Sequence, residues 1–411
     1  MTLRQDAGRI IAAALAESMP GEAVHRALAD IHLPEGGRVI PVAVGKAAFE
    51  MARAAREALG DRMENGIVIT KYGHVKGEIK GMTCFEAGHP IPDENGFRAT
   101  EAVLRRVSGL HAQDTVLFLL SGGGSALFEK PLLPPGEMAD ITRQLLACGA
   151  DIVEINTLRK RFSAVKGGKF ALSCTPARVC SVILSDIIGD PVDMIASGPA
   201  CPDPSTCAQA WEIAERYHLK LSDDARALLS IETPKQLQNA ETHVTGSVRQ
   251  LCAAAQRVCG ELGYQTMLLT TGLSCEAREA GAFLAAVARD HQDTPCSLAF
   301  IAGGETVVHV TGNGLGGRNQ ELALAAAQGI AGCRDTCVFS VGSDGTDGPT
   351  DAAGGYADAH TCGDLAAHGM DIRKYLADND AYHALQAANG LIMTGPTGTN
   401  VNDLTVVLIK R

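Results

Sequence analysis

Apolar residues in this chain fall into short runs, and longer amphipathic segments separate these runs. The runs span 38–44, 66–70, 115–120, 178–185, 264–271, 296–303, 336–343 and 403–409. Continuous apolar runs of this length are typical of parallel strands that are buried on both faces. Helical patterns lie among them, for example at 4–19, 21–31 and 46–59. The alternation predicts an α/β protein with largely parallel sheets flanked by helices.

The length of the chain predicts more than one domain. Its 411 residues exceed what one ordinary hydrophobic core organises, so we expect two domains. The segment 200–245 is richer in Pro, Ser, Asp and Thr than its surroundings and marks the junction. We therefore predict an N-terminal domain over 1–240 and a C-terminal domain over 241–411.

Charge and cysteine usage limit the class of partner. The net charge of -11 argues against nucleic acid or an anionic membrane as the main partner. The 13 cysteines form no paired framework, and we find neither a signal peptide nor a long apolar span. A cytoplasmic protein with reduced thiols is expected, and a homodimer is the default oligomer.

Two glycine-containing turns follow predicted strands and favour an anion. After the strand at 38–44 comes Gly45-Lys46, which puts an ammonium at a helix start, although a solvated lysine is the ordinary alternative. After the strand at 115–120 comes the loop Ser121, Gly122, Gly123, Gly124 and Ser125. Its exposed N–H groups suit phosphate or carboxylate, whereas a plain tight turn is the alternative. It lacks the spacing of a Walker A loop.

Charged clusters elsewhere supply candidate partners for that anion. The segment 156–171 is strongly basic and includes Arg159 and Lys166; such a run is usually a solvated helix face, but it could gather phosphates. Asp186 and Asp190 follow the strand at 178–185. Carboxylates there suit Mg²⁺ coordination or proton acceptance from a hydroxyl, although Gly-Asp-Pro is also a good turn.

The segment 302–327 contains the strongest pointer to a different activity. Gly312, Gly314 and Gly317 satisfy G-x-G-x-x-G after an expected strand and before a helix, which favours a dinucleotide and an oxidoreductase. The helix begins with Arg318 and Asn319, however, and these side chains are better suited to bind phosphate or carboxylate. Glu305, in the turn before, is a further candidate binding residue.

Two polar loops near the C-terminus are candidates for a nucleotide or Mg²⁺. The loop 341–355 carries Asp344 and Asp347 after an apolar strand. The loop 394–403 offers hydroxyls, an amide and backbone donors from Thr397, Gly398, Thr399 and Asn400. For both, a purely structural loop is an equal alternative.

Taken together, these clusters resemble the type-2 glycerate kinase family, whose C-terminal part is the MOFRL domain. The likeness covers nearly the whole chain, and its motifs occur in one order without departure. They are GKAA (45–48), GHPIPDENG (88–96), SGGGSALFEKP (121–131), NTLRKRFSAVKGGKFA (156–171), SDIIGDPVDMIASGP (185–199), GGET (303–306), GGRNQE (316–321), GSDGTDGPTDAAG (342–354) and TGPTGTNVND (394–403).

The resemblance implies a Rossmann-like N-terminal domain, an α/β MOFRL domain and an active site in the cleft between them. It also implies ATP-dependent phosphorylation of D-glycerate, commonly at the 2-hydroxyl, with Lys46 and Arg318 matching the family's catalytic basic pair. Some relatives are named hydroxypyruvate reductase, so an NAD(P)H-dependent oxidoreductase remains the alternative.

The residues themselves favour the kinase. Phosphoryl transfer needs positioning and charge neutralisation, which this chain's basic helix starts and anion nest can supply. The hypothesis places the γ-phosphate of ATP between Lys46 and Arg318, and Asp186 or Asp190 binds Mg²⁺ or accepts the hydroxyl proton. The Ser121–Ser125 loop would hold the glycerate carboxylate or a phosphate. A reductase would need a proton donor such as His89 or His309, each of which more often has a structural role.

Overall fold

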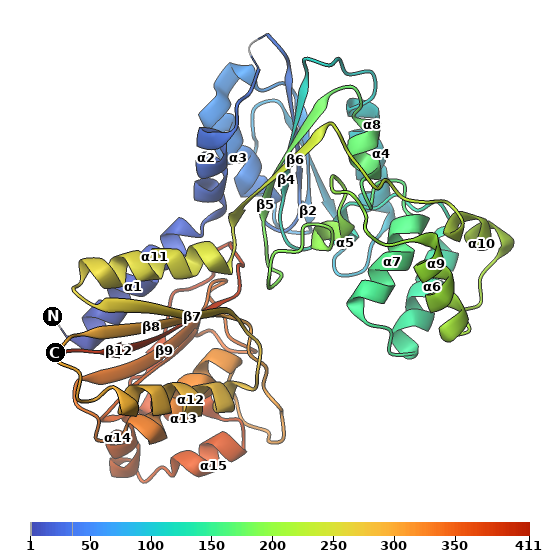
Figure 1. Cartoon of the computed structure of the whole chain (residues 1–411). Helices are drawn as coiled ribbons and strands as arrows, with labels where there is room; N and C mark the ends of the chain where they lie inside the picture. The colour runs from blue at the N-terminus through green and yellow to red at the C-terminus, as the bar shows by residue number, and fades with distance from the viewer. Residues whose placement is uncertain (1, 35) are drawn as a thin grey trace. The chain divides into compact units, whose positions relative to one another are not determined.

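The computed structural model describes residues 2–34 and 36–411, which form two compact units (Figure 1). The N-terminal unit consists of Ala23–Leu184 and Asp190–Thr245. The C-terminal unit consists of Met1–Glu22, Ser185–Gly189 and Gly246–Arg411. These units differ from the predicted domains 1–240 and 241–411, because the start of the chain and a short segment near 187 group with the C-terminal part.

Buried contacts explain why the start of the chain belongs to the C-terminal unit. Helix α1 (Leu3–Glu17) packs against α11 (Val248–Glu261). Its Asp6 is 1% exposed and accepts hydrogen bonds of 2.7 Å from both Tyr264 Oη and Lys410 Nζ. A buried carboxylate with two such partners fixes the helix to this unit.

The N-terminal unit is built on a six-stranded sheet with the order β3-β2-β1-β4-β5-β6. The strands are β1 (Val39–Val44), β2 (Gly66–Lys71), β3 (Met82–Ala87), β4 (Thr115–Leu120), β5 (Arg178–Leu184) and β6 (Ala240–Gly246). Every pairing from β3 to β5 is parallel. The strand order reverses between β1 and β4, and ligands of such sheets bind at the carboxyl ends of the strands at that point.

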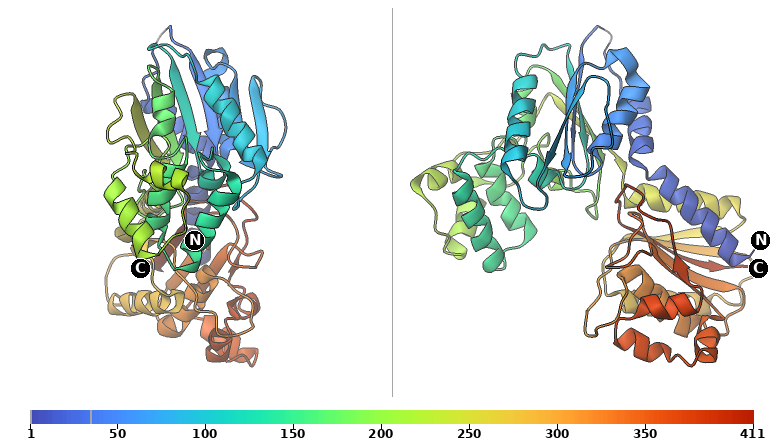
Figure 2. Two further views of the ribbon diagram at one scale, coloured as in Figure 1. Left: turned by 90° about the vertical axis from the view of Figure 1, so that its right-hand side faces the viewer. Right: turned by 180° about the vertical axis from the view of Figure 1, so that it is seen from behind.

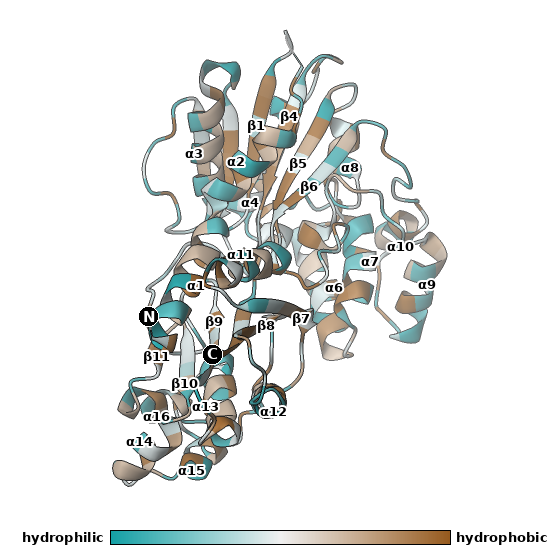
Figure 3. Ribbon diagram, turned by 60° about the vertical axis from the view of Figure 1, so that its left-hand side comes forward, coloured by the Kyte–Doolittle hydropathy of each residue, from teal (hydrophilic) through white to brown (hydrophobic). Residues whose placement is uncertain are grey.

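Helices cover both faces of this sheet. Helices α2 (Pro20–Asp30) and α3 (Ala48–Leu59) lie on one face, and α4 (Glu94–Arg106) and α8 (Lys169–Ser173) lie on the other (Figure 1). Coverage on both faces explains why β1 and β4 are buried at every position and are hydrophobic along their length (Figure 3).

A group of helices lies beside the sheet (Figure 2) and has a hydrophobic core of its own. It comprises α6 (Pro135–Ala147), α7 (Ile152–Phe162), α9 (Cys207–Arg216) and α10 (Asp223–Leu229). Leu145, Leu158, Phe162 and Leu229 are buried between these helices. The short helix α5 (Gly124–Leu127) lies directly after β4.

The C-terminal unit contains a second six-stranded sheet with the order β11-β10-β9-β12-β8-β7. The strands are β7 (Gln265–Leu273), β8 (Leu298–Gly304), β9 (Thr336–Gly342), β10 (Gly354–Asp358), β11 (Leu391–Ile392) and β12 (Asp403–Ile409). Helices α1 and α11 cover one face of this sheet. Helices α12 (Ala277–Asp290) and α13 (Arg318–Ile330) cover the other, with α14 (Thr361–Ala367), α15 (Ile372–Ala377) and α16 (Ala381–Ala387) beyond them (Figures 1 and 3).

Strand direction in this second sheet differs from the expectation of largely parallel pairing. Only β7 and β8 pair in parallel among the described residues, and the pairings of β12 with β8 and β9 are antiparallel. The final strand enters the middle of the sheet from the opposite end. An apolar run reveals that a strand is buried but not which way it points. No helix in the described part of the chain is long and apolar enough to cross a membrane.

Candidate functional site

Lys46 and the glycine-rich loop lie side by side at the carboxyl edge of the N-terminal sheet. Lys46 follows β1 and the loop follows β4, the two neighbouring strands at which the strand order reverses. The backbone N–H of Lys46 donates to Gly122 O at 2.9 Å, and that of Ala47 donates to Ser121 Oγ at 3.0 Å. The structure therefore brings two of the predicted anion-binding features together where such sheets bind ligands.

The loop presents unpaired backbone donors. Gly123 has φ +87°, in the left-handed region, and caps the start of α5. Within the described residues, the N–H groups of Gly122, Gly123, Gly124 and Ser125 donate to no protein acceptor. Consecutive N–H groups of this kind form a concave site for an anion. Ser121 differs from the others, since it is 1% exposed and its hydroxyl already accepts the Ala47 N–H.

Ser125 is connected to a buried polar chain that the sequence did not reveal. Its Oγ lies 3.4 Å from Ser197 Oγ, and Ser197 donates to Asn156 Oδ1 at 2.8 Å. Ser197 has φ +62° and follows Ala196 with φ +51°, so two non-glycine residues in succession adopt the left-handed conformation. Such strain persists only where the surroundings over-determine it, and it often marks a functional site.

Arg159 and Lys166 hold the far end of the same loop. Arg159 Nη2 donates to Ser125 O at 3.1 Å, and Lys166 Nζ donates to Ser125 O at 2.8 Å and to Phe128 O at 3.1 Å. Lys166 is 0% exposed, 3.6 Å from a carboxylate oxygen of Glu129, and burial lowers its pKa to about 8. These contacts assign both residues to positioning the loop, while direct contact with substrate stays a prediction.

The basic segment 156–171 is mostly buried, so the interpretation as a solvated helix face is wrong. Lys160 and Arg161 are 2% and 1% exposed. Lys160 Nζ is paired with Asp203 at 3.0 Å, and Lys169 Nζ donates to the carbonyls of Lys160, Arg161 and Ser163 at the end of α7. Lys160 and Lys169 are therefore used in contacts within the N-terminal unit.

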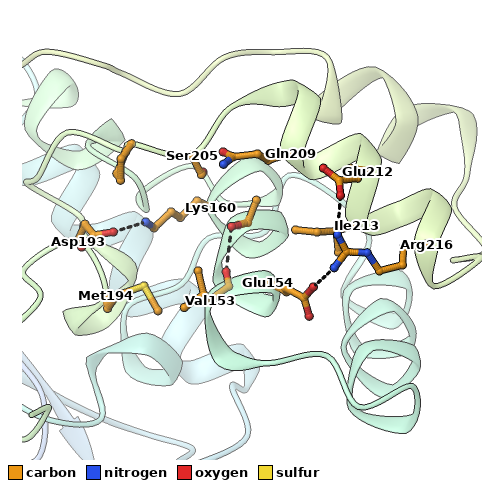
Figure 4. Close-up of a pocket in the computed structure, with 12 residues that line it drawn as sticks. Val153, Glu154, Lys160, Asp193, Met194, Ser205, Gln209, Glu212, Ile213 and Arg216 are labelled. Atoms are coloured by element: carbon orange, nitrogen blue, oxygen red, sulfur yellow. Dashed lines mark hydrogen bonds and ion pairs between the residues drawn. The ribbon is translucent and has the colours of Figure 1, made fainter.

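A pocket of about 340 Å³ lies beside this network, between α7, α9 and the chain near 193–205 (Figure 4). Its charged side chains pair with one another. Arg216 bridges Glu154 and Glu212, and Lys160 reaches Asp193 at 3.2 Å. Because these groups already neutralise one another, we place the candidate site at the sheet edge instead.

Two histidines lie near Lys46 at the same edge of the sheet. His74 Nδ1 lies 2.9 Å from Lys46 O. His89 follows β3, and a Cβ placed on Gly123 would lie 3.1 Å from His89 Cδ2 and 3.2 Å from Lys46 Cγ. Gly123 therefore packs against both side chains. A larger residue would adopt a strained left-handed φ and would require these two neighbours to shift.

In the C-terminal unit, Arg318 begins α13 and its guanidinium is held by carboxylates. Nε and Nη2 bind the two oxygens of Asp403 at 2.5 and 2.9 Å, and Nη1 lies 3.3 Å from Glu305. Burial opposes the charge, but these ion pairs outweigh it and raise the pKa of Arg318. Asp403, at the start of β12, fixes the orientation of the arginine, and sequence reasoning did not identify it.

Asp347 and Asn319 form hydrogen bonds that stabilise the start of α13. The carboxylate of Asp347 accepts the backbone N–H groups of Asn319 at 3.2 Å and of Gln320 at 2.9 Å. Asn319 Nδ2 donates to Asp347 as well, and Ser340 donates to Asn319 Oδ1. Asp347 thus takes the place of an N-cap for this helix. Its contact with a nucleotide stays a prediction.

The G-x-G-x-x-G segment lacks the context of a dinucleotide site. The expected strand before it is absent from the described residues, because β8 ends at Gly304 and α13 begins only at Arg318. The N–H groups of the segment are used internally: Gly312 donates to Asn379 Oδ1 at 3.0 Å and Gly314 to Asp378 O at 2.8 Å. Gly312 and Gly314 permit close packing on the chain at 378–380, and Gly317 packs against Asp347. The motif therefore serves internal packing in this structure.

The two C-terminal polar loops pack against each other. Thr397 donates its N–H to Asp344 O at 3.1 Å and its hydroxyl to Ser343 O at 2.6 Å. Thr399 Oγ1 donates to Ser18 O, and Gly398, with φ +83°, is exposed between them. The side-chain oxygen of Asn400 accepts the N–H of Asn402. The structure thus brings Asp344 and Thr397 together, whereas Thr399 has a structural contact.

The predicted acidic residues fall in different units. Asp186 lies in the C-terminal unit, where Asn402 Nδ2 donates to its carbonyl at 3.0 Å and to Glu305 Oε2 at 3.2 Å. Asp190 begins the next segment of the N-terminal unit with φ +53°. Within the described residues, no group of three His, Cys, Asp or Glu side chains is arranged to hold a metal ion.

Comparisons with known proteins agree with this architecture. The family model described as a domain of unknown function (DUF4147) matches residues 6–230, and that of the MOFRL family matches 298–403. A D-glycerate 2-kinase of Thermotoga maritima is 49% identical, with 99% of each chain covered. A crystal structure of a glycerate kinase from the same organism superposes with a TM-score of 0.95 at 49% identity and 99% coverage of each chain.

A protein of Agrobacterium vitis named as a putative hydroxypyruvate reductase is 38% identical, covering 100% of this chain and 95% of its own. The α/β fold with two units and the order of motifs define a two-domain phosphotransferase architecture. The chain belongs to the glycerate kinase family that the DUF4147 and MOFRL models describe.

Proposed function

We propose that this protein is an ATP-dependent kinase that phosphorylates D-glycerate at the 2-hydroxyl, giving 2-phosphoglycerate and ADP. The proposal rests on the position of Lys46 beside four backbone N–H groups that have no protein acceptor among the described residues. These groups lie where the strand order of the N-terminal sheet reverses. Phosphoryl transfer requires this kind of pre-positioned positive charge more than it requires a reactive side chain.

The glycine-rich loop binds the carboxylate of glycerate in this proposal. Backbone N–H groups hold a carboxylate through several short hydrogen bonds without adding a second full charge beside Lys46. Lys166 and Arg159 fix Ser125 O from behind, so the loop is formed before substrate arrives. A pre-formed loop reduces the entropy lost when the substrate is positioned.

Lys46 and Arg318 neutralise the oxygens of the transferring γ-phosphoryl group. Lys46 lies in the turn before α3, Arg318 begins α13, and Asp403 holds the Arg318 guanidinium in one orientation. A guanidinium that is already oriented does not need to reorganise as charge spreads over the phosphoryl oxygens. The loops that carry Asp344 and Thr397 bind the nucleotide, with Gly398 and Asn400 as further candidate contacts.

Two carboxylates of this chain would hold the Mg²⁺ that accompanies the nucleotide. Magnesium commonly binds through one or two carboxylates together with substrate phosphates and water. Asp186 and Asp190 are the proposed carboxylate ligands. When bound, the ion neutralises charge on the phosphate oxygens.

Hydroxypyruvate reduction is the second candidate, because the family includes a relative with that name. Its one positive sequence feature was the Gly312–Gly317 motif, in which the N–H groups of residues 312–315 are used within the chain.

All thirteen cysteines are free, which fits a reducing compartment, so we place the reaction in the cytoplasm.

The two activities separate in one set of assays. We expect ADP release from ATP only when D-glycerate is present, and a loss of about 10³-fold or more in kcat for Lys46→Ala and for Arg318→Ala. NAD(P)H oxidation with hydroxypyruvate and no ADP release would overturn the proposal. Near-normal turnover of both variants would overturn the roles of these two residues.

A further inference from the structure

The carboxyl edge of the N-terminal sheet contains a side chain to which the mechanism above gives no role. His89 follows β3, the edge strand of the order β3-β2-β1-β4. Because these four strands are parallel, the residues after each of them converge on one edge. His89 therefore lies at the same edge as Lys46 and the glycine-rich loop.

Contact with Gly123 places the imidazole of His89 against the loop. A Cβ on Gly123 would lie 3.1 Å from His89 Cδ2 and 3.2 Å from His89 Nε2, and also 3.2 Å from Lys46 Cγ. The imidazole and the lysine side chain thus flank the same backbone position. A substrate held by the N–H groups of this loop would meet both.

The ring nitrogens of His89 are available to a ligand. Among the described residues, no protein group forms a hydrogen bond with either nitrogen, although the side chain is half-buried. Because the side chain is partly exposed and its nitrogens make no hydrogen bond with the described residues, a bound ligand can reach them. His74, by contrast, is bonded to Lys46 O.

We propose that His89 accepts the proton of the glycerate hydroxyl that receives the phosphoryl group. This role rests on the proposed kinase function and adds a catalytic residue to it. The hydroxyl proton passes to a ring nitrogen of His89, and the hydroxyl oxygen forms a bond to the γ-phosphorus of ATP. The bond from that phosphorus to the bridging oxygen breaks, its electron pair leaves with ADP, and the imidazolium then releases the proton to solvent.

The charges around His89 favour this role. Burial lowers its pKa, and Lys46, Lys71 and His74, the charged or titratable groups that face it, lower it further. The imidazole is therefore neutral near pH 7 and can accept a proton. A neighbouring ammonium also promotes return of that proton to solvent after transfer.

The test is the pH dependence of ADP release by the full-length protein with D-glycerate and ATP, for the wild type and for His89→Asn and His89→Gln. For the wild type we expect kcat/KM for glycerate to fall at acid pH, with a midpoint below 6.5. For both variants we expect a loss of about 10²–10³-fold in kcat and no such acid limb. His25→Asn, an exposed histidine of α2, is the matched control and should behave as the wild type.

A third variant of His89 distinguishes a catalytic role from a loss of folding. His89→Ala leaves a space beside Gly123, and added imidazole should restore part of its kcat, which a structural role does not predict. Retention of the acid limb in the variants, a loss confined to KM, or absence of rescue in a variant with wild-type circular dichroism would overturn the role of His89. These outcomes differ from failure of the kinase proposal, in which the wild type itself releases no ADP with glycerate.

Discussion

The guanidinium of Arg318 and the carboxylate of Asp403 form a two-point ion pair, with Nε–Oδ2 at 2.5 Å and Nη2–Oδ1 at 2.9 Å. The two residues come from the start of α13 and the start of β12, so the pair joins a helix terminus to the middle of the C-terminal sheet. A two-point pair fixes both the position and the plane of the guanidinium. The arginine is therefore oriented by Asp403 before any phosphate binds.

Asp403→Asn should lower kcat without unfolding the protein. The amide keeps the shape of the carboxylate but removes one charge-assisted bond, worth about 1.5–3 kcal/mol, which corresponds to a loss of about 10- to 150-fold. Steady-state kinetics with D-glycerate and ATP measures this. Glu261→Gln, which breaks an exposed pair with Arg257, is the control and should change nothing. Unchanged kcat in Asp403→Asn would mean that Arg318 needs no such support.

Gly123→Ala should impair turnover because the position has no room for a side chain. The left-handed φ of +87° costs an alanine about 1 kcal/mol, and the added methyl group meets both His89 and Lys46. We expect at least about a tenfold loss in kcat/KM from displacement of these two side chains. Gly136→Ala on α6, where the structure leaves open space, is the matched control. Equal activity of the two variants would show that Gly123 is not part of the active site.

Ser197 should act through its hydroxyl and not through its backbone alone. Ser197→Ala and Ser197→Gly both remove the bond to Asn156 and the contact with Ser125, so both should lower kcat/KM for glycerate by about tenfold. Glycine relieves the left-handed strain, so Ser197→Gly should be more stable than Ser197→Ala by about 1 kcal/mol.

Kinetics and thermal unfolding together separate the two effects at Ser197. Ser173→Ala, an exposed serine, provides the control and should match the wild type. If Ser197→Gly restored full activity while Ser197→Ala did not, the backbone and not the hydroxyl would be responsible.

Asp347 should make the stability of the protein depend on pH in a defined direction. Burial raises its pKa from 3.8 to about 6, and the N–H donors of Gln320 and Asn319 offset this only in part. Between these pH values the folded chain keeps a proton that the unfolded chain has lost. The stabilisation from this proton is complete below about pH 3.8 and is lost as pH rises through about 6.

The measurement is the free energy of unfolding against pH for the wild type and for Asp347→Asn. Their difference should change by about 3 kcal/mol across this window, because one pKa unit corresponds to 1.36 kcal/mol. Asp290→Asn, at an exposed carboxylate, should show no such change. A constant difference between wild type and Asp347→Asn would refute the raised pKa.

The buried strands were predictable from the sequence because burial leaves a direct signal in residue type. The apolar runs at 38–44, 115–120 and 403–409 became β1, β4 and β12, each buried along its length. The strands that escaped prediction include β3 and β6, which lie at the edges of the first sheet and are partly exposed. Edge strands mix polar and apolar residues, so their pattern resembles that of loops.

The candidate site was predictable where a loop directly follows a buried strand. Lys46 and the Ser121–Ser125 loop meet because β1 and β4 are neighbours. Asp403 and Ser197 could not be found in this way, because their partners Arg318 and Asn156 are distant in sequence and no periodicity links them. The same limit applies to Lys166, which sequence pattern presents as a surface cation and the fold buries beside Glu129.

The most direct test of the central claim is identification of the product formed by the purified protein from D-glycerate and ATP. We predict stoichiometric ADP and 2-phosphoglycerate, resolved from 3-phosphoglycerate by ³¹P NMR, with both products lost in Lys46→Ala. Oxidation of NAD(P)H with hydroxypyruvate, without ADP or phosphoglycerate, would contradict the account.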